Sequence, residues 1–274
     1  MDWKKVFMLC QSTTEEESKN FADTDYQAQI KYDGERIIAV IIDKEVILIN
    51  RRGKICNLHF QEIVEDLKVL PNCIIDGEII SLDDDFSKLM KRAMTKTPSK
   101  LIPLQTEVPI KYMVFDVLGI GKATNKINLP LRDRITELNG LFHGLEFKHT
   151  EIAKYGNIPN MLIQAHEEKR EGLIIKNLNA LYEGRRSEGW KKLKFFQETT
   201  LIVTKFTENP KGIRVEDDKG NACQIAGEQC NEVKEKINSN GSAEIYIQYL
   251  TQNTETHRFR FPSYRGLIKE KNDI

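Results

Sequence analysis

The most restrictive feature of this sequence is a six-residue aliphatic run at 37–42, followed only two residues later by a second aliphatic run at 45–49. Runs of β-branched residues favour strands, and the Asp43-Lys44 pair between them is short enough for a tight turn. We therefore expect a β-hairpin over 37–49. Such a hairpin requires further strands or helices against which its aliphatic side chains can be buried.

Further β-branched runs lie at 74–75, 79–80, 112–118 and 173–175, and helical patterns fall between them at 60–70, 86–94 and 131–142. Strands and helices do not alternate regularly, as they would in a parallel βαβ sheet. The pattern instead predicts an α+β fold with antiparallel sheets.

The pattern changes near residue 196. Beyond it, short strand-like runs lie at 201–206, 212–216, 222–226, 243–250 and 258–261, with one helix-compatible segment at 228–237. Five short strands with a single helix in that position are typical of a small OB-fold barrel. We expect two domains, 1–196 and 197–274.

Composition excludes several classes of protein. The five cysteines are scattered without a Cys-x-x-Cys pair, and the five histidines lack metal-ligand spacing, so neither disulfides nor a zinc site is expected. The longest aliphatic run is far below the roughly 20 residues that cross a bilayer. These features predict a cytoplasmic protein without membrane contact.

Charged residues inside or beside aliphatic strands point to a ligand site. They occur in six segments: 31–36 (Lys-Tyr-Asp-Gly-Glu-Arg), 50–53, 74–80, 115–116, 171–176 and 190–194. Unpaired charge in such places costs several kcal/mol, so these side chains should face one another or a ligand. We expect one cleft lined by the cations Lys31, Arg36, Arg51, Lys176, Lys192 and Lys194 and the carboxylates Glu78 and Glu171. Such a cleft suits a nucleoside triphosphate with Mg²⁺ or Mn²⁺.

In this order the six segments resemble the ATP-dependent DNA ligases of the covalent nucleotidyltransferase superfamily, and the small size resembles the compact phage, viral and bacterial members. The Asp33 form of the Lys-x-Asp-Gly-x-Arg motif is the DNA-ligase form, whereas many RNA ligases carry Glu there. The segment 129–134 (Leu-Pro-Leu-Arg-Asp-Arg) also resembles a stretch that follows the Phe-Asp strand in these ligases.

The resemblance implies a nucleotidyltransferase (adenylation) domain that uses ATP and serves DNA replication, repair or recombination. Lys31 would attack the α-phosphate and form lysyl–AMP. The AMP would pass to the 5′-phosphate of a nick in duplex DNA, and the 3′-hydroxyl would close the nick, with the enzyme a monomer. The implied ATP contacts are Gln29 and Phe115 at the base, Glu78 at the ribose, Arg36, Arg51 and Arg186, and Lys176, Lys192 and Lys194 at the phosphate. The implied metal ligands are Glu78 and Glu171, and Lys192 and Lys194 are also catalytic.

Two further expectations concern basic residues. The acid-free stretch 87–100 predicts DNA-phosphate contacts by Lys88, Lys91 and Arg92, with an ordinary solvated helix face as the alternative. At the C-terminal end, the Arg expected by resemblance falls on Ile268, so Lys269 or Lys271 is predicted to replace it at the pyrophosphate leaving group.

Other interpretations remain open at this stage. An RNA ligase or an RNA-capping nucleotidyltransferase shares much of the motif order, and a non-catalytic nucleic-acid-binding remnant would keep the fold. The presence of Lys31, Glu78, Glu171, Lys192 and Lys194 together favours catalysis. Phe115 could be plain core packing, and Trp190 is expected at the junction of the two domains.

Overall fold

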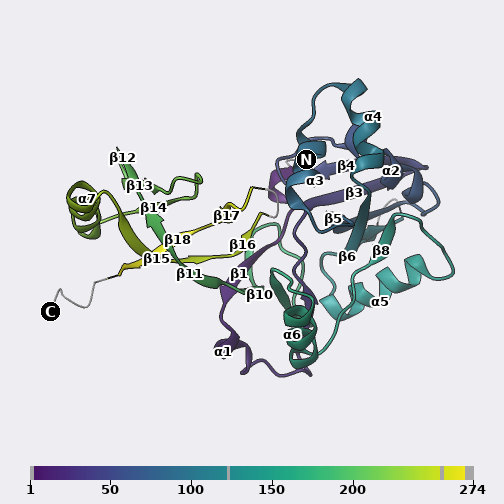
Figure 1. Ribbon diagram of the computed structural model, residues 1–274. Helices are drawn as coiled ribbons and strands as arrows, with labels where there is room; N and C mark the ends of the chain where they lie inside the picture. The colour runs from purple at the N-terminus through teal and green to yellow at the C-terminus, as the bar shows by residue number, and fades with distance from the viewer. Residues whose placement is uncertain (1–2, 122–123, 254–255, 269–274) are drawn as a thin grey trace. The chain divides into compact units, whose positions relative to one another are not determined.

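The computed structural model describes residues 3–121, 124–253 and 256–268 and divides into two compact units, 1–193 and 194–274 (Figure 1). The division lies three residues before the boundary expected from the sequence. The predicted Lys269 and Lys271 lie outside the described residues. Both units mix helices with several sheets, so the predicted α+β class is confirmed.

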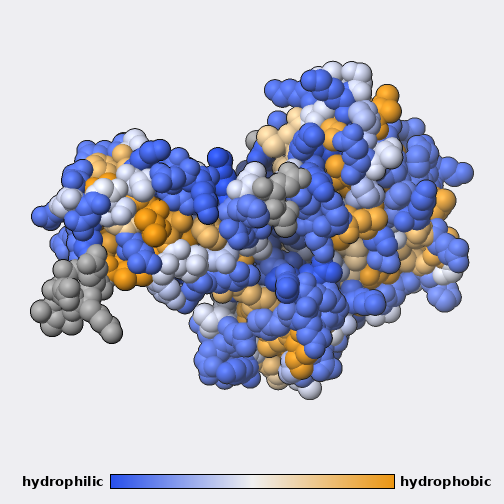
Figure 2. All heavy atoms as spheres, viewed as in Figure 1, coloured by the Kyte–Doolittle hydropathy of each residue, from blue (hydrophilic) through white to orange (hydrophobic). Residues whose placement is uncertain are grey.

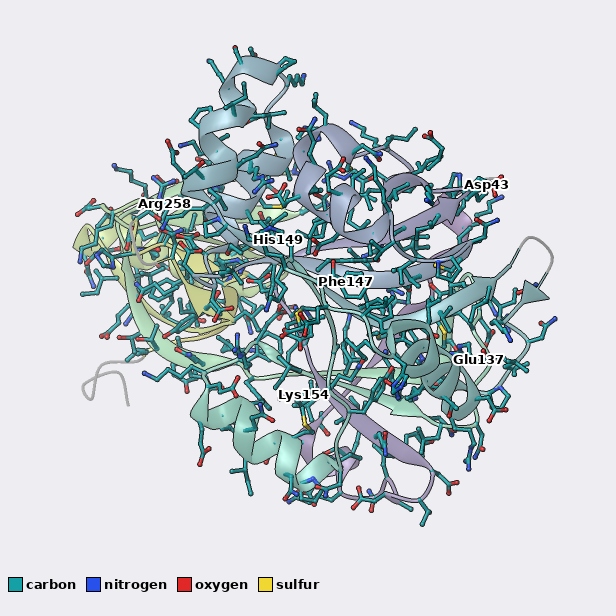
Figure 3. All side chains as sticks on the ribbon, turned by 90° about the vertical axis from the view of Figure 1, so that its right-hand side faces the viewer. Asp43, Glu137, Phe147, His149, Lys154 and Arg258 are labelled. Carbon is teal, nitrogen blue, oxygen red and sulfur yellow. The ribbon has the colours of Figure 1, made fainter. Side chains whose placement is uncertain are left out.

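The larger sheet of the first unit is built around the predicted hairpin. Its strand order is β4-β3-β5-β6-β7, and β8 pairs with β6. The hairpin turns at Asp43 and Lys44, whose positive φ angles of 50° and 68° suit a two-residue turn; Figure 3 labels Asp43 at this turn. The strands are β3 (Glu35–Ile42), β4 (Glu45–Asn50), β5 (Cys73–Ser81), β6 (Ile110–Ile120), β7 (Thr124–Asn125) and β8 (Thr150–Ile152).

Four helices accompany this sheet: α2 (Gln61–Leu67), α3 (Phe86–Met94), α4 (Pro98–Glu107) and α5 (Leu131–Phe142). Apolar residues of α2 and α3, such as Ile63 and Leu89, are fully buried with strand residues such as Ile37 and Ile75 in one hydrophobic core. Removing this apolar surface from water is the main stabilising contribution to the unit.

A second sheet in the first unit has the order β1-β10-β9-β2. It consists of β1 (Leu9–Thr13), β10 (Arg186–Lys194), β9 (Gly172–Asn177) and β2 (Tyr26–Ile30), with the short helix α1 (Glu15–Ser18) after β1 and α6 (Ile158–Glu167) packed on β2 and β9. A second core cluster joins Trp190 of β10 to Ile38 of β3 and Met113 and Phe115 of β6. The candidate site is therefore built between two sheets.

The second unit contains two three-stranded sheets and a short ribbon. One sheet joins β11 (Gln197–Val203), β15 (Ala243–Tyr249) and β18 (Ser263–Leu267), and the other joins β12 (Lys205–Asn209), β13 (Gly212–Glu216) and β14 (Ala222–Ile225). The ribbon pairs β16 (Thr251–Gln252) with β17 (Phe259–Arg260). Helix α7 (Gln229–Asn240) ends at Gly241, whose φ of 77° is the left-handed conformation that favours glycine at a helix end.

Two sequence expectations for this unit need correction. Among the described residues the sheets do not close into one hydrogen-bonded barrel, because the first long strand is interrupted at Thr204 and its two halves join different sheets. The fifth strand is also not the run at 258–261, of which Phe259 and Arg260 form one strand of the short ribbon. It is β18, whose Tyr-Arg-Gly sequence carries little aliphatic signal.

The surface is largely polar. The face drawn in Figure 2 is mostly hydrophilic, with apolar side chains in separate patches. Within the ranges that the structure describes, no helix is both long and apolar enough to cross a membrane.

Candidate active site

Lys31 directly follows β2 and forms an ion pair with Glu171. Its Nζ lies 2.6 Å from Glu171 Oε2, and the Lys31 backbone N–H donates to the carbonyl of Gly172 at 2.9 Å. The Glu171 side chain is only 5% exposed and that of Lys31 is 21% exposed. The lysine is therefore reachable from solvent while its ammonium group is held by an almost buried carboxylate.

Gly34 explains why the motif requires a glycine at this position. A Cβ atom on Gly34 would lie 2.1 Å from the carbonyl oxygen of Ile79 and 3.0 Å from Cγ of Glu78. Only a residue without a side chain permits the loop to approach β5 this closely. The glycine thereby brings Lys31 beside the strand that carries Glu78.

Arg36 is held inside the site by Asp76, a residue for which sequence reasoning assigned no role. Its Nη2 and Nε donate to the two Asp76 carboxylate oxygens at 2.6 and 3.1 Å, and its Nη1 donates to the carbonyl of Met8 at 2.6 Å. Burial alone would lower the pKa of Arg36, but Asp76 raises it above its usual value. The cation therefore stays charged, and its guanidinium is already bound within the protein.

Glu78 is the cross-strand neighbour of Arg36, on β5. Burial raises the pKa of its carboxyl group to about 8, although Lys31 and Arg36 act in the opposite direction. Within the described part of the chain, Glu78 has no hydrogen-bond or ion-pair partner. A half-buried carboxylate without such a partner is suited to a ligand or a cation.

Phe115 lies on β6 at the centre of an aromatic cluster. Its ring meets Trp190 edge-on, with 6.0 Å between centroids and an interplanar angle of 78°. The guanidinium carbon of Arg36 lies 5.3 Å from the Phe115 centroid, and Nζ of Lys176 lies 4.4 Å from it. The cluster places Trp190 in a core of the first unit together with Phe115, three residues before the division between the units.

Lys176 is more deeply buried than a phosphate-gripping lysine would be, at 1% exposure. Its Nζ lies 4.0 Å from the Trp190 centroid and donates to the Tyr155 hydroxyl at 3.0 Å. Burial lowers the pKa of Lys176 to about 7, although Asp116 acts in the opposite direction. The structure thus places Lys176 among aromatic rings rather than at an open phosphate position.

Gln29, the expected base contact, is buried on β2 beside the same cluster. Its Nε2 donates to the carbonyl of Ala153 at 3.3 Å. Two backbone hydrogen bonds, of 2.9 and 3.0 Å, also join Ala28 to Gly156. Segment 153–156 is therefore attached to β2 by the side chain of Gln29 and by the backbone of Ala28.

The remaining basic residues are placed differently from one another. Lys192 is half-buried on β10 opposite Ser12, and Arg186 on the same strand donates to the Cys10 carbonyl. Lys194 ends this strand and is the first residue of the second unit, where its Nζ lies 5.3 Å from the ring centroid of Phe261 of the same unit. Arg51 is exposed in the turn after β4. The structure brings Lys31, Arg36, Glu78, Phe115, Glu171 and Lys176 together, and it does not place Arg51 among them.

The predicted DNA-contacting residues of α3 separate into two kinds. Lys88 is 42% exposed and pairs with Asp83 at 2.8 Å, and Lys91 is exposed on the same helix. Arg92 is fully buried, where it binds Glu62 through one nitrogen at 2.5 and 2.6 Å and donates to the Val108 carbonyl at 2.8 Å. The assignment of Arg92 to DNA is wrong, because its buried guanidinium joins α3 to Glu62 of α2 and to Val108 at the end of α4.

Three supporting residues were missed by sequence reasoning. Asp76 binds Arg36, and Tyr182 donates to Asp76 at 2.7 Å. Asp76 stood in an aliphatic run, where a buried carboxylate signals a partner, but the identity of the partner requires the strand register. Tyr155 lies in a segment without any recognisable pattern, so no sequence signal could have found it.

The carboxylates present are compatible with one divalent cation. Mg²⁺ is usually held by one or two carboxylates together with substrate phosphates, and not by a dedicated protein cage. Glu78, for which the described residues give no hydrogen-bond or ion-pair partner, fits that donor set, and Glu171 binds the nearby Lys31. Among the residues that the structure describes, no three His, Cys, Asp or Glu side chains form a metal-binding group of their own.

The first unit has two sheets, a lysine–glutamate pair at the neighbouring ends of β2 and β9, and an adjoining aromatic cluster. This is the arrangement of a nucleotidyltransferase-type ligase fold. The family model described as "ATP dependent DNA ligase domain" matches residues 7–194, which is well over half of the chain. The chain belongs to the ATP-dependent DNA ligase family, and the resemblance inferred from its motifs is confirmed.

Individual relatives agree. The SPβ prophage-derived DNA ligase-like protein LigB of Bacillus subtilis (strain 168) is 31% identical over 200 residues, which cover 69% of this chain and 68% of LigB. A DNA ligase of Methanococcus aeolicus is 29% identical over 200 residues, covering 65% of this chain but only 34% of that protein. The chain therefore spans about a third of the length of some curated relatives.

A solved structure from a study of Lig E DNA ligases has a TM-score of 0.68 to this chain at 17% identity. The match covers 96% of this chain and 100% of the Lig E chain. At this identity the likeness concerns the fold, which extends over both units.

Proposed function

We propose that this chain seals nicks in duplex DNA that carry a 5′-phosphate and a 3′-hydroxyl, using ATP. Lys31 Nζ attacks the α-phosphorus of ATP, the bond to the β-phosphate oxygen breaks, and pyrophosphate leaves. The 5′-phosphate oxygen of the nick then attacks the same phosphorus and releases Lys31. Finally, the 3′-hydroxyl attacks the activated 5′-phosphate, loses its proton and releases AMP.

The observation that carries this proposal is the Lys31–Glu171 pair beside a buried aromatic cluster. Only a neutral amine is a nucleophile, and an ammonium that donates to Glu171 has a carboxylate in place to receive its proton. Phe115 offers a ring on which a purine can stack, and Gln29 lies next to it at the segment 153–156. Lys192 and Lys194 are assigned to phosphate oxygens and Arg186 and Arg51 to the nucleotide or the nick, all from their motif positions.

A divalent cation, Mg²⁺ or Mn²⁺, completes the proposed site, with Glu78 and Glu171 as its protein ligands. When bound, it would neutralise charge on the phosphate oxygens. The chain's own part is to leave Glu78 without a direct ion pair among the described residues while holding Lys31 nearby. Glu78 is also the proposed ribose contact.

We assign the second unit to an OB-fold. Its sheets have the neighbour order β12-β13-β14 and β11-β15-β18, and β14 also lies against β18. Because β11 and β12 are successive parts of one strand interrupted at Thr204, these neighbours follow one another around a ring of five strands, with α7 between the third and the fourth. This arrangement supports a barrel-like module for a nucleic-acid duplex, with the protein acting as a monomer.

Sealing of defined substrates tests the function. A labelled nick in DNA should be closed with ATP and Mg²⁺, and Lys31→Ala should abolish closure. Lys44→Ala, at the hairpin turn, is the matched control and should close nicks at the wild-type rate. Nicked RNA and RNA–DNA hybrids should be sealed at least tenfold more slowly. Preferential sealing of RNA would favour an RNA ligase, and binding to nicked DNA without closure would favour a non-catalytic module.

A further inference from the structure

Tyr155 occupies the centre of the candidate base site although it belongs to no motif. Its hydroxyl donates to the backbone carbonyl of Phe115 at 2.7 Å and accepts a hydrogen bond from Lys176 Nζ at 3.0 Å. Tyr155 therefore joins the stacking residue on β6 to the buried lysine on β9. Figure 3 labels Phe147, His149 and Lys154 of the segment that leads to Tyr155.

Phe115 needs such an attachment because the strand ladders do not include it. The register between β5 and β6 shifts between Asp76, which pairs with Asp116, and Gly77, which pairs with Val114. The shift leaves Phe115 of β6 without a partner on β5. On the other side, the pairing of β6 with β8 ends at Val114. In the described registers Phe115 thus has no cross-strand partner. A bulge at this point redirects the side chain but leaves the backbone less constrained.

The second hydrogen bond of Tyr155 fixes Lys176 against the rings. Lys176 forms no ion pair with a carboxylate of the described chain, and its Nζ lies within 5.1 Å of the centroids of Phe115, Trp190 and Tyr155. The Tyr155 hydroxyl is the hydrogen-bond acceptor that the structure gives it. The Tyr155 hydroxyl therefore acts on Phe115 in two ways: directly through the Phe115 carbonyl, and through Lys176, which lies against the Phe115 ring.

We propose that Tyr155 is a positioning residue for base recognition, which sets the place of Phe115 through the Phe115 carbonyl and through Lys176 before ATP binds. This inference rests on the proposed use of Phe115 as the purine-stacking ring. Because the two hydrogen bonds of the Tyr155 hydroxyl go to Phe115 and Lys176, its effect falls on nucleotide affinity and not on the chemical step.

Tyr155→Phe tests this role, because it removes only the hydroxyl. The KM for ATP in lysyl–AMP formation should rise about three- to tenfold, the range that one lost buried hydrogen bond produces. The kcat should stay within twofold. Tyr246→Phe, which removes a hydroxyl that donates to Glu198 in the second unit, is the matched control and should leave both values unchanged.

Binding to a probe without a base separates positioning from general damage. In a Lys31→Ala background, Tyr155→Phe should weaken ATP binding by the same factor but leave the dissociation constant of inorganic tripolyphosphate unchanged. Lys176→Met should also weaken ATP binding, and the double variant should be no weaker than the poorer single one, because both act through the same chain of contacts.

Three results would overturn the inference: unchanged ATP affinity in Tyr155→Phe, an equal loss for tripolyphosphate, or additive losses in the double variant. Lys176→Met applies the same test if Tyr155→Phe does not fold. If the wild-type protein forms no lysyl–AMP, the proposed function has failed instead, and the two failures are thereby distinguished.

Discussion

Lys31 Nζ and the Glu171 carboxylate lie 2.6 Å apart, with the carboxylate on the first residue before β9 and almost excluded from solvent. This pair fixes the position of the proposed nucleophile and gives its proton an acceptor. A lysine held this way must give up its proton before it can attack.

Glu171→Gln should therefore slow lysyl–AMP formation by about 10²-fold, the usual contribution of a positioned acid or base. The rate is measured by intact mass at timed intervals after ATP is added. Glu168→Gln is the control, because Glu168 binds Gln164 and Arg170 and should not affect the rate. Wild-type kinetics in Glu171→Gln would exclude the proposed proton acceptor.

Arg92 and its neighbours on α3 should respond to mutation in opposite ways. Arg92→Met leaves Glu62 without its buried partner and should destabilise the protein by about 3–5 kcal/mol. Lys88→Ala with Lys91→Ala should change stability by no more than about 0.5 kcal/mol. The double change should instead flatten the slope of log DNA affinity against log salt, since fewer phosphate counterions are released. An unchanged slope would leave this helix face without a role in DNA binding.

Lys176 should make stability depend on pH. Its pKa falls from 10.5 in the unfolded chain to about 7 in the folded protein, because burial disfavours the charged form. Between these values the unfolded state binds more protons, so stability rises with pH. The cost of the buried charge is complete below about pH 7 and disappears above about pH 10.5.

Lys176→Met removes this dependence. The melting temperature of Lys176→Met relative to wild type should be several degrees higher at pH 6 than at pH 9.5, because one pKa unit corresponds to about 1.4 kcal/mol. A difference that is independent of pH would show that Lys176 titrates at its ordinary value.

Gly34→Ala tests the close approach that places Lys31. The added Cβ would lie 2.1 Å from the Ile79 carbonyl oxygen, so the loop or β5 must move. We expect a loss of about 1–3 kcal/mol and slower lysyl–AMP formation. Gly140→Ala on α5 is the control, since a Cβ there meets nothing within 4 Å and should stabilise the helix by about 0.5–1 kcal/mol. Normal adenylation in Gly34→Ala would show that the approach is not needed.

The sequence was sufficient to predict the position of an element where its local pattern and its burial agree. The hairpin turn at Asp43-Lys44 and helices α3 and α5 lie where the aliphatic and helical patterns predicted them, because strand and helix periodicity is set by the core on which each element packs. The motif lysine and its glutamate are 140 positions apart. The charge pattern placed both residues in one cleft, but it did not predict that they pair, because the pairing depends on β2 and β9 being neighbours.

What could not be predicted depends on tertiary contacts. A basic run has the same sequence pattern whether its arginine points outward or inward. Arg92 is buried because it binds Glu62 and the carbonyls of His59 and Val108, which are distant in sequence. The bulge at Phe115 arises from the register between β5 and β6, and Tyr155 reaches Phe115 from the segment after β8, so neither feature has a local sequence pattern. The barrel was predicted from the number of strands, whereas the interruption at Thr204 depends on how one strand bends between two sheets.

The mass of the intact protein after incubation with ATP and Mg²⁺ tests the central claim most directly. The wild-type protein and Lys44→Ala should each gain the mass of one AMP, and Lys31→Ala should gain none. The adduct should disappear when nicked DNA is added. A wild-type protein that gains no AMP under any condition, or an adduct that persists in Lys31→Ala, would contradict the assignment of Lys31 as the nucleophile of a DNA ligase.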